Sequence, residues 1–289
     1  MEAKIQDKMV KKGERNTKFF HRTTVQRRMH NNISFIQNQE GARVEKHEEI
    51  VEEFLRHFKQ VHSEPLANRN LAIEKIIQKV PKIITEEHNE LLLRPILPQE
   101  VDVAMHQLKE GKAPGPDGFS TSFYHKFWEM IRDEVWQVAE ESRALHWLLP
   151  SLNVTFIVLI PKEEKSNTPD KFCPIALCNV IYKVISKVIA NRLKPLLPFL
   201  ISPEQSGYVE GRQILDGIIL THEVIHSLKH HKQAGMILKL DLSKAFDKLS
   251  WTYMKKNVKC LRVLTHVGAV DYKSYYLLLL LHTCERNPL

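Results

Sequence analysis

Cysteine is scarce in this sequence, and long apolar runs are absent. The four cysteines form no C-x-x-C pair, and no secretory signal peptide precedes them. This predicts reduced thiols in an intracellular protein, nuclear or cytoplasmic, without a zinc site. The longest apolar run, residues 275–281, is far shorter than the roughly 20 residues needed to cross a bilayer. The sequence therefore excludes a disulfide scaffold and predicts no membrane partner.

Acidic residues are scarce at the start of the chain. Residues 1–31 contain nine lysines and arginines but only Glu2, Asp7 and Glu14, a net charge of +6 out of the chain's +8. A basic arm without a long apolar face favours a polyanionic partner, with nucleic acid ahead of an anionic membrane. A solvated helix face that binds nothing stays open as the alternative. The whole chain, 289 residues and 43% hydrophobic, is long and apolar enough for a sizeable core.

Helical periodicity recurs along the chain. It predicts helices over 48–61, 99–109, 121–145 and 213–231, and another after residue 178. The helix over 121–145 is expected to pack on a core through Phe123, Phe127, Met130, Ile131, Val138 and Leu145, with Trp128 and Trp136 adding area. The helix after residue 178 is expected to have a basic face with these residues: Lys183, Lys187, Arg192 and Lys194.

Two apolar segments predict strands. Residues 153–160, NVTFIVLI, are rich in β-branched side chains, and Pro161 ends the run. Residues 236–240 form the second predicted strand, which delivers Asp241 to its end before Ser243 offers a helix cap. A carboxylate at the end of a strand suits a metal ion. From this segment alone, a carboxylate that merely caps a backbone amide is an equal alternative.

Six motifs follow one another along the chain. They are GERNTKFFHRTTVQRRMHNNI (13–33), KAPGPDGFSTSFYHKFW (112–128), FIVLIPK (156–162), CPIALCNVIYKVISKVIANRLKPLLP (173–198), ISPEQSGYVEGRQILDGI (201–218) and LKLDLSKAFDKLSW (238–251). In this order they resemble the reverse transcriptase of non-LTR retrotransposons, most closely the long interspersed elements of plants. Each motif is weak alone, but accidental similarity of all six in order is improbable.

The resemblance implies an α+β fold: a partial right-hand polymerase with an N-terminal helical extension, fingers and an incomplete palm. It predicts four parts. These are a basic N-terminal linker and helix (1–62), a helical extension with the KAPGPDGF loop (63–150), truncated fingers and palm (151–258) and a divergent tail (259–289).

The resemblance also implies a catalytic site. Asp241 and the backbone carbonyl of Leu242 match the positions that bind Mg²⁺ in the family, for phosphoryl transfer from a deoxynucleotide to a primer 3′-hydroxyl. Phe246 matches the aromatic residue that discriminates against a 2′-hydroxyl, and Lys162 the cation for the incoming triphosphate. An ordinary core aromatic and a solvent-facing lysine are the respective alternatives.

The implied partners are an RNA template and a DNA primer, with no dedicated protein partner. The cations expected to contact nucleic acid are Arg15, Lys18, Arg22, Arg27, Arg28, Lys112 and Arg212. For Arg212, a surface salt bridge is the alternative. The aromatic rings between the basic residues of the arm, Phe19 and Phe20, either stack on bases or are buried.

The chain departs from the family in two places. Cys173 stands where relatives carry an arginine that clamps the triphosphate, and cysteine cannot supply that charge. The sequence also contains no F-A-D-D motif, which carries two further metal-binding aspartates, and no thumb. We therefore expect a truncated, poorly soluble fragment that is inactive by itself. An RNA-binding remnant and an enzyme completed by another chain are the competing hypotheses.

Overall fold

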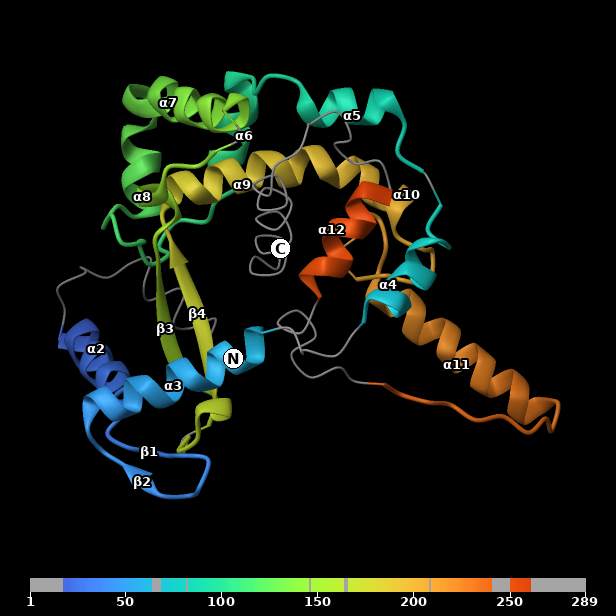
Figure 1. Ribbon diagram of the computed structural model, residues 1–289, viewed down its shortest axis with the longest axis horizontal. Coiled ribbons are helices and arrows are strands. Elements are labelled where there is room, and N and C mark those ends of the chain that lie inside the picture. The colour runs from blue at the N-terminus through green and yellow to red at the C-terminus, as the bar shows by residue number, and fades with distance from the viewer. Residues whose placement is uncertain are drawn as a thin grey trace. The chain divides into compact units, whose positions relative to one another are not determined.

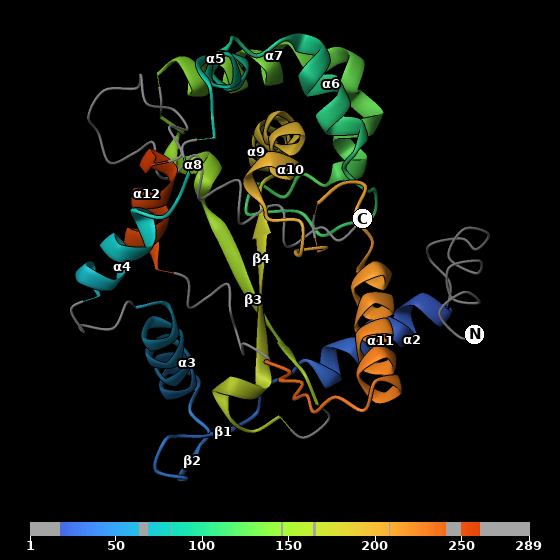
Figure 2. The same ribbon diagram turned by 90° about the vertical axis from the view of Figure 1, so that its right-hand side faces the viewer.

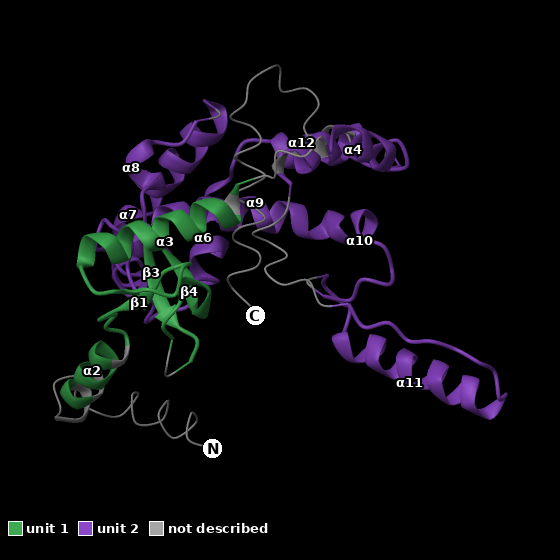
Figure 3. Cartoon of the chain, turned by 60° about the horizontal axis from the view of Figure 1, so that its bottom comes forward, with its two compact units in different colours: residues 1–63, 157–176 green, residues 64–156, 177–289 purple. Residues whose placement is uncertain are grey.

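The computed structural model describes residues 18–63, 69–81, 83–145, 147–163, 166–207, 209–240 and 250–260. The chain forms two compact units (Figure 3). Unit 1 consists of Met1–Ser63 and Ile157–Ala176, and unit 2 of Glu64–Phe156 and Leu177–Leu289. Among the described residues, no helix is both long and apolar enough to span a membrane.

Unit 1 packs one amphipathic helix against two small pairs of strands. Its elements are α2 (Lys18–His30), β1 (Ile36–Gln37), β2 (Arg43–Val44), α3 (His47–His62), η1 (Pro169–Lys171) and most of the paired strands β3 (Thr155–Pro161) and β4 (Phe172–Cys178) (Figure 1). Ile36 pairs with Val44 in the antiparallel β1–β2 ladder. The core contains Ile36, Ile50, Phe54 and Phe172, with the last two rings edge to face at 5.1 Å.

Unit 2 is helical. Its elements are α4 (Asn70–Ile77), α5 (Glu86–Leu93), α6 (Pro98–His106), α7 (Thr121–Ala144), α8 (Pro150–Asn153), α9 (Val180–Leu193), η2 (Lys194–Leu196), α10 (Leu197–Leu200), α11 (Ile214–His230) and α12 (Trp251–Cys260). The helices α5, α6 and α7 lie along one side of α9 (Figures 1 and 2). Their shared core is apolar and includes Val101, Met105, Trp128, Val184 and Val188.

Local signals explain where the helices of unit 2 begin. Pro98 starts α6, because its fixed φ suits the first turn and its missing N–H is not needed there. Ser120 caps α7, since its hydroxyl accepts a hydrogen bond from the Phe123 amide at 3.3 Å. The predicted helices over 48–61, 99–109, 121–145 and 213–231 correspond to α3, α6, α7 and α11.

The predicted apolar stripe of α7 is confirmed in part, since Phe123, Ile131 and Val138 pack against the core and Trp128 lies in it. It was wrong for Phe127, Met130 and Leu145, which are 36%, 75% and 68% exposed, and it missed the buried Tyr124 and Val135. Trp128 also makes a polar contact: its Nε1 donates to Asp102 of α6 at 2.8 Å while the ring lies in the core. Periodicity alone does not weigh such a polar partner.

The strand predictions met with different outcomes. The segment 153–160 forms β3 from Thr155 onward, but its partner β4 was missed. The predicted strand over 236–240 was wrong: within the described residues this segment pairs with no other strand, and Met236 and Leu240 are 90% and 77% exposed. A strand requires hydrogen-bonding neighbours, which an apolar pattern cannot supply. The described chain is thus mainly helical with two two-stranded sheets.

Candidate functional site

Part of the predicted catalytic site lies outside the described residues. This applies to Asp241, Leu242 and Phe246, and to Arg15 of the basic arm. Within the part of the chain that is described, no group of three or more histidine, cysteine, aspartate or glutamate side chains could hold a metal ion. The carboxylate and carbonyl of residues 241–242 are hard oxygen donors of the kind Mg²⁺ prefers. They are therefore the donors that this chain would offer to the metal.

The turn between β3 and β4 carries Lys162. Its backbone N–H donates to the Lys171 carbonyl at 2.9 Å, which continues the strand pairing. Its ammonium is exposed and donates to the Asp170 carbonyl at 2.8 Å. Cys173 is exposed on β4. Lys162 is thus an exposed cation in this turn, and its role in binding the triphosphate stays a prediction.

The KAPGPDGF loop, residues 112–119, is attached to the junction between β4 and α9 through Asn179. The side-chain Oδ1 of Asn179 accepts from the Asp117 amide at 3.2 Å. Its Nδ2 donates to the carbonyls of Ser151 and Leu152, at 3.1 and 3.3 Å. Lys112 lies on the same loop with an exposed side chain. Sequence reasoning missed Asn179, because an asparagine before a helix suggests only an N-cap.

Titratable side chains gather around this junction. Burial raises the pKa of the Tyr124 phenol to about 12, and the negative charge of Asp117 adds to the shift. Burial also lowers the pKa of the Lys183 amine, while Cys178 and Asp117 partly oppose that shift. Lys183, predicted on the basic face of α9, is half-buried and packs at this junction.

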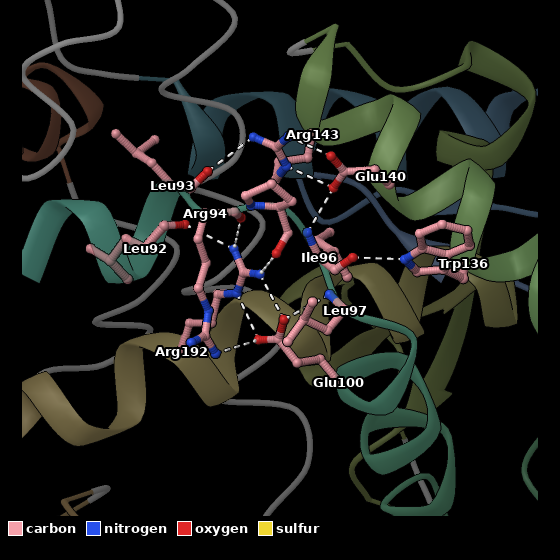
Figure 4. Close-up of polar contacts among 11 residues, drawn as sticks. Leu92, Leu93, Arg94, Ile96, Leu97, Glu100, Trp136, Glu140, Arg143 and Arg192 are labelled. Carbon is pink, nitrogen blue, oxygen red and sulfur yellow. Dashed lines mark hydrogen bonds and ion pairs between the residues drawn. The ribbon is translucent and has the colours of Figure 1, made fainter.

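Arg192 was predicted to belong to the basic face of α9, and the structure shows that it is buried. Its guanidinium is buried and donates five hydrogen bonds (Figure 4). Two reach Glu100, both at 2.8 Å, and three reach the carbonyls of Leu92, Arg94 and Pro95, at 3.1, 2.7 and 2.9 Å. Glu100 also accepts the Leu97 amide at 3.0 Å. The network fixes the start of α6 and the end of α5 to α9.

Opposing effects act on the pKa of Glu100. Burial is the largest single effect and raises this pKa. The hydrogen bonds from Arg192 and the Leu97 amide, together with the charges of Arg192 and Arg94, lower it by more, so that the pKa falls to about 2. A second pair lies beside this network: Arg143 binds Glu140, and Glu140 accepts the Ile96 amide at 2.7 Å (Figure 4). The Arg143 hydrogen bond is the main reason why the pKa of Glu140 is lowered.

Arg212 organises the loop before α11. Its Nη1 donates to the carbonyls of Ser202 and Gln205, at 2.6 and 2.8 Å, and its Nη2 to those of Pro198 and Ile201, at 3.3 and 3.1 Å. These bonds differ from the surface salt bridge that was considered as the alternative. They hold the loop in one conformation, and the contact of Arg212 with nucleic acid stays a prediction.

The arm helix α2 is exposed wherever its side chains are described. Arg22, Arg27 and Arg28 are all exposed, and the helix sequence contains no acidic residue. Even its apolar Val25 and Met29 are 55% and 74% exposed. Lys18 lies in its first turn. The described part of α2 therefore presents positive charge to solvent with no acidic residue on the same helix to balance it.

Comparisons with known proteins point in one direction. Residues 160–286 match the family model described as "Reverse transcriptase (RNA-dependent DNA polymerase)". The chain is 26% identical over 242 residues to the "Transposon TX1 uncharacterized 149 kDa protein" of Xenopus laevis, an alignment covering 83% of this chain and 18% of that protein. It is 28% identical over 154 residues to the "Retrovirus-related Pol polyprotein from type-2 retrotransposable element R2DM" of Drosophila melanogaster, covering 52% and 14%.

A similar protein from Popillia japonica, the "Retrovirus-related Pol polyprotein from type-1 retrotransposable element R2", is 25% identical over 158 residues, which is 54% of this chain and 21% of that protein. The chain thus spans about a fifth or less of the length of these relatives. Residues 160–286 are thus similar to a reverse transcriptase domain, and the relatives named above are proteins of transposable elements.

Proposed function

We propose that the chain comprises the fingers and the first part of the palm of a right-hand reverse transcriptase from a plant-type long interspersed element, preceded by a helical extension. The collinear motifs between residues 13 and 251 support this, and so does the reverse transcriptase match over 160–286. The match is the observation on which the proposal chiefly rests. The four parts predicted from the sequence, 1–62, 63–150, 151–258 and 259–289, belong to the same proposal.

We expect that residues 1–289 do not polymerise DNA by themselves. Mg²⁺, when bound, would activate the primer hydroxyl and stabilise the leaving pyrophosphate. Asp241 and the Leu242 carbonyl would be its protein ligands, but a single carboxylate leaves Mg²⁺ bound mostly to water and poorly fixed. Phe246 would contact the sugar, and Lys162 the triphosphate. The sequence holds no F-A-D-D motif to complete the ligand set.

Primer extension tests this inference. The assay uses an RNA template, a DNA primer, deoxynucleotides and Mg²⁺, and compares the chain with Asp241→Ala. We expect no extension from either protein. Extension that the substitution abolishes would show that the chain is active, alone or as a self-complementing oligomer, and would overturn the inference of inactivity. Extension that survives the substitution would remove Asp241 from the site.

RNA binding without chemistry is the second candidate function, and α2 favours it. Arg22, Arg27 and Arg28 stand exposed on a helix without acidic residues, so no carboxylate of their own helix pairs with them. By contrast, Arg43, Lys46 and Arg56 lie beside Glu45, Glu49 and Glu53. Exposed cations of this kind displace counterions when they meet phosphates, and this drives nucleic-acid binding.

A pair of triple variants tests the role of α2. In the first, Arg22, Arg27 and Arg28 become alanine; in the matched control, Arg43, Lys46 and Arg56 do. Both remove three positive charges from unit 1. Fluorescence anisotropy with single-stranded RNA at several salt concentrations should show a salt slope reduced by about 2 in the first variant, at ~0.7 per phosphate contact. If both variants lose RNA affinity and salt slope equally, the effect comes from net charge alone, and this would contradict a binding site on α2.

A further inference from the structure

We propose that Asn179 is a positioning residue that fixes the KAPGPDGF loop against the β4–α9 junction, so that Lys112 meets RNA phosphates in one place. The inference rests on the proposed RNA-binding function, because it gives Lys112 a contact with RNA. It goes further by assigning the geometry of that contact to a residue outside the loop.

The side chain of Asn179 is buried and uses both its oxygen and its nitrogen to join the loop to α8. It is 2% exposed, and its amide binds two segments at once: the Asp117 amide of the loop and the Ser151 and Leu152 carbonyls of α8. Asn179 also occupies the N-cap position of α9, yet in the described structure its side chain makes no cap bond to that helix. The buried side-chain amide of Asn179 therefore does not stabilise the start of α9 as a cap; its hydrogen bonds go to the loop and to α8.

Gly115 shows how close the loop approaches. A Cβ placed on Gly115 would lie 2.5 Å from the Asn179 backbone nitrogen and 2.6 Å from the Cys178 carbonyl carbon. Real Cβ atoms do not approach other heavy atoms this closely, so only glycine permits this contact. The junction thus contributes the Asn179 side chain to this contact, and the loop contributes Gly115, whose missing side chain allows the close approach.

Lys112 lies between two anchored positions of the loop. On one side the Gly111 amide donates to the Ser122 hydroxyl at 3.3 Å, and on the other Gly115 packs on the junction. The turn after Gly115 is closed by the Gly118 amide, which donates to the Gly115 carbonyl at 3.1 Å. The backbone around Lys112 is thus held while its side chain is exposed. Such an arrangement lowers the entropy lost when a cation binds a phosphate.

A double-mutant cycle separates positioning from general stability. Lys112→Ala is measured in the wild-type chain and again in Asn179→Ala, with Lys109→Ala as a control for an exposed lysine three residues before the loop. In the wild type we expect Lys112→Ala to weaken RNA binding about fivefold, or ~1 kcal/mol, and to reduce the salt slope by about 0.7. In Asn179→Ala, the same substitution should change affinity less than about twofold. The effect of Lys109→Ala should be equal in both backgrounds.

Two further variants disturb the contact in other ways. Gly115→Ala pushes the loop away and should reproduce the loss of coupling. Asn179→Asp keeps an acceptor for the Asp117 amide but loses both donors to α8, so its effect should be intermediate. Thermal melting selects the variants that remain folded, and hydrogen exchange of the Asp117 amide reports on the attachment without any RNA.

The outcomes distinguish the inference from the function on which it rests. If Lys112→Ala weakens binding equally in the wild type and in Asn179→Ala, the positioning role is wrong while RNA binding stands. If the wild type does not bind RNA at low salt, the proposed binding function fails, together with the RNA contact of Lys112. Unchanged exchange of the Asp117 amide in Asn179→Ala would overturn the attachment itself, whatever the RNA result.

Discussion

Replacing Arg192 by methionine should destabilise unit 2 more than any exposed charge change. Methionine fills much of the same space but leaves the Glu100 carboxylate without its buried partner and the Leu92, Arg94 and Pro95 carbonyls without a donor. Breaking a buried ion pair from one side costs about 3–5 kcal/mol. The Arg192 side chain is 5% exposed, so we expect a loss within that range.

Lys194→Met is the matched control. Lys194 lies two residues later and binds Glu210 at 3.1 Å, but its side chain is 42% exposed. An exposed pair of this kind contributes less than about 1 kcal/mol. Arg192→Lys should fall between the two, because an ammonium keeps the charge but has three donors in place of five.

Urea unfolding followed by tryptophan fluorescence measures these differences. Trp128 lies in the core of unit 2, and Trp136 packs against that core. The fluorescence of these two side chains therefore reports on the unfolding of unit 2. With a slope of about 2 kcal/mol per molar urea, a loss of about 4 kcal/mol lowers the midpoint by about 2 M. Equal midpoints for Arg192→Met and Lys194→Met would refute the claim that the buried network stabilises the fold.

The pH dependence of the network follows from the pKa of Glu100. The pKa is lowered from 4.5 to about 2 in the folded chain, so the stabilisation is fully present above pH 4.5 and is lost as the pH falls towards 2. Unscreened, the shift would correspond to about 3 kcal/mol; because the Glu100 side chain keeps 19% exposure, we expect nearer ~2 kcal/mol. The stability difference between the wild type and Glu100→Gln should therefore shrink below pH 4.5. A constant difference down to about pH 2.5 would contradict this.

Three smaller predictions follow from other contacts. Arg212→Ala should free four carbonyls of the loop over 198–205 and speed its cleavage in limited proteolysis, with little change in the urea midpoint. Ser120→Ala should cost about 1 kcal/mol in urea unfolding through the lost cap of α7, and Ser120→Asp should restore it. Ile219→Lys on α11, where Ile219 is 56% exposed, should reduce concentration-dependent light scattering, whereas an unchanged signal would argue against self-association through this helix.

The sequence predicted those parts of the fold that local patterns control. Helical periodicity over 48–61, 99–109, 121–145 and 213–231 predicted α3, α6, α7 and α11, and the structure shows that Pro98 and Ser120 start two of them. The strand over 236–240 was wrong because strand formation requires a neighbour, and no apolar pattern encodes one. The exposed apolar residues of this segment carry the signal of a buried strand without the pairing that would bury them.

The candidate site was harder to predict, because its decisive contacts join residues far apart in the sequence. Asn179 binds Asp117, 62 residues away, and Arg192 binds Glu100, 92 residues away. A helix turns by about 100° per residue, so Arg192 and Lys194 point to nearly opposite sides, and only Arg192 is buried. The row of basic residues along the sequence does not show that Arg192 meets an acceptor, Glu100, from a distant segment.

The cations that were expected to contact nucleic acid differ in whether their N–H groups already bind protein acceptors. A guanidinium whose N–H groups already bind carbonyls, as in Arg212, offers a phosphate its charge but few free donors. Arg22, Arg27 and Arg28 stand exposed on α2 without neighbouring acids in that helix, and Lys112 stands exposed on an anchored loop. Substitution of Arg212 should therefore change RNA affinity through the shape of its loop, and substitution of the α2 arginines through the salt slope. Because the two effects appear in different measurements, the contribution of each cation can be assigned separately.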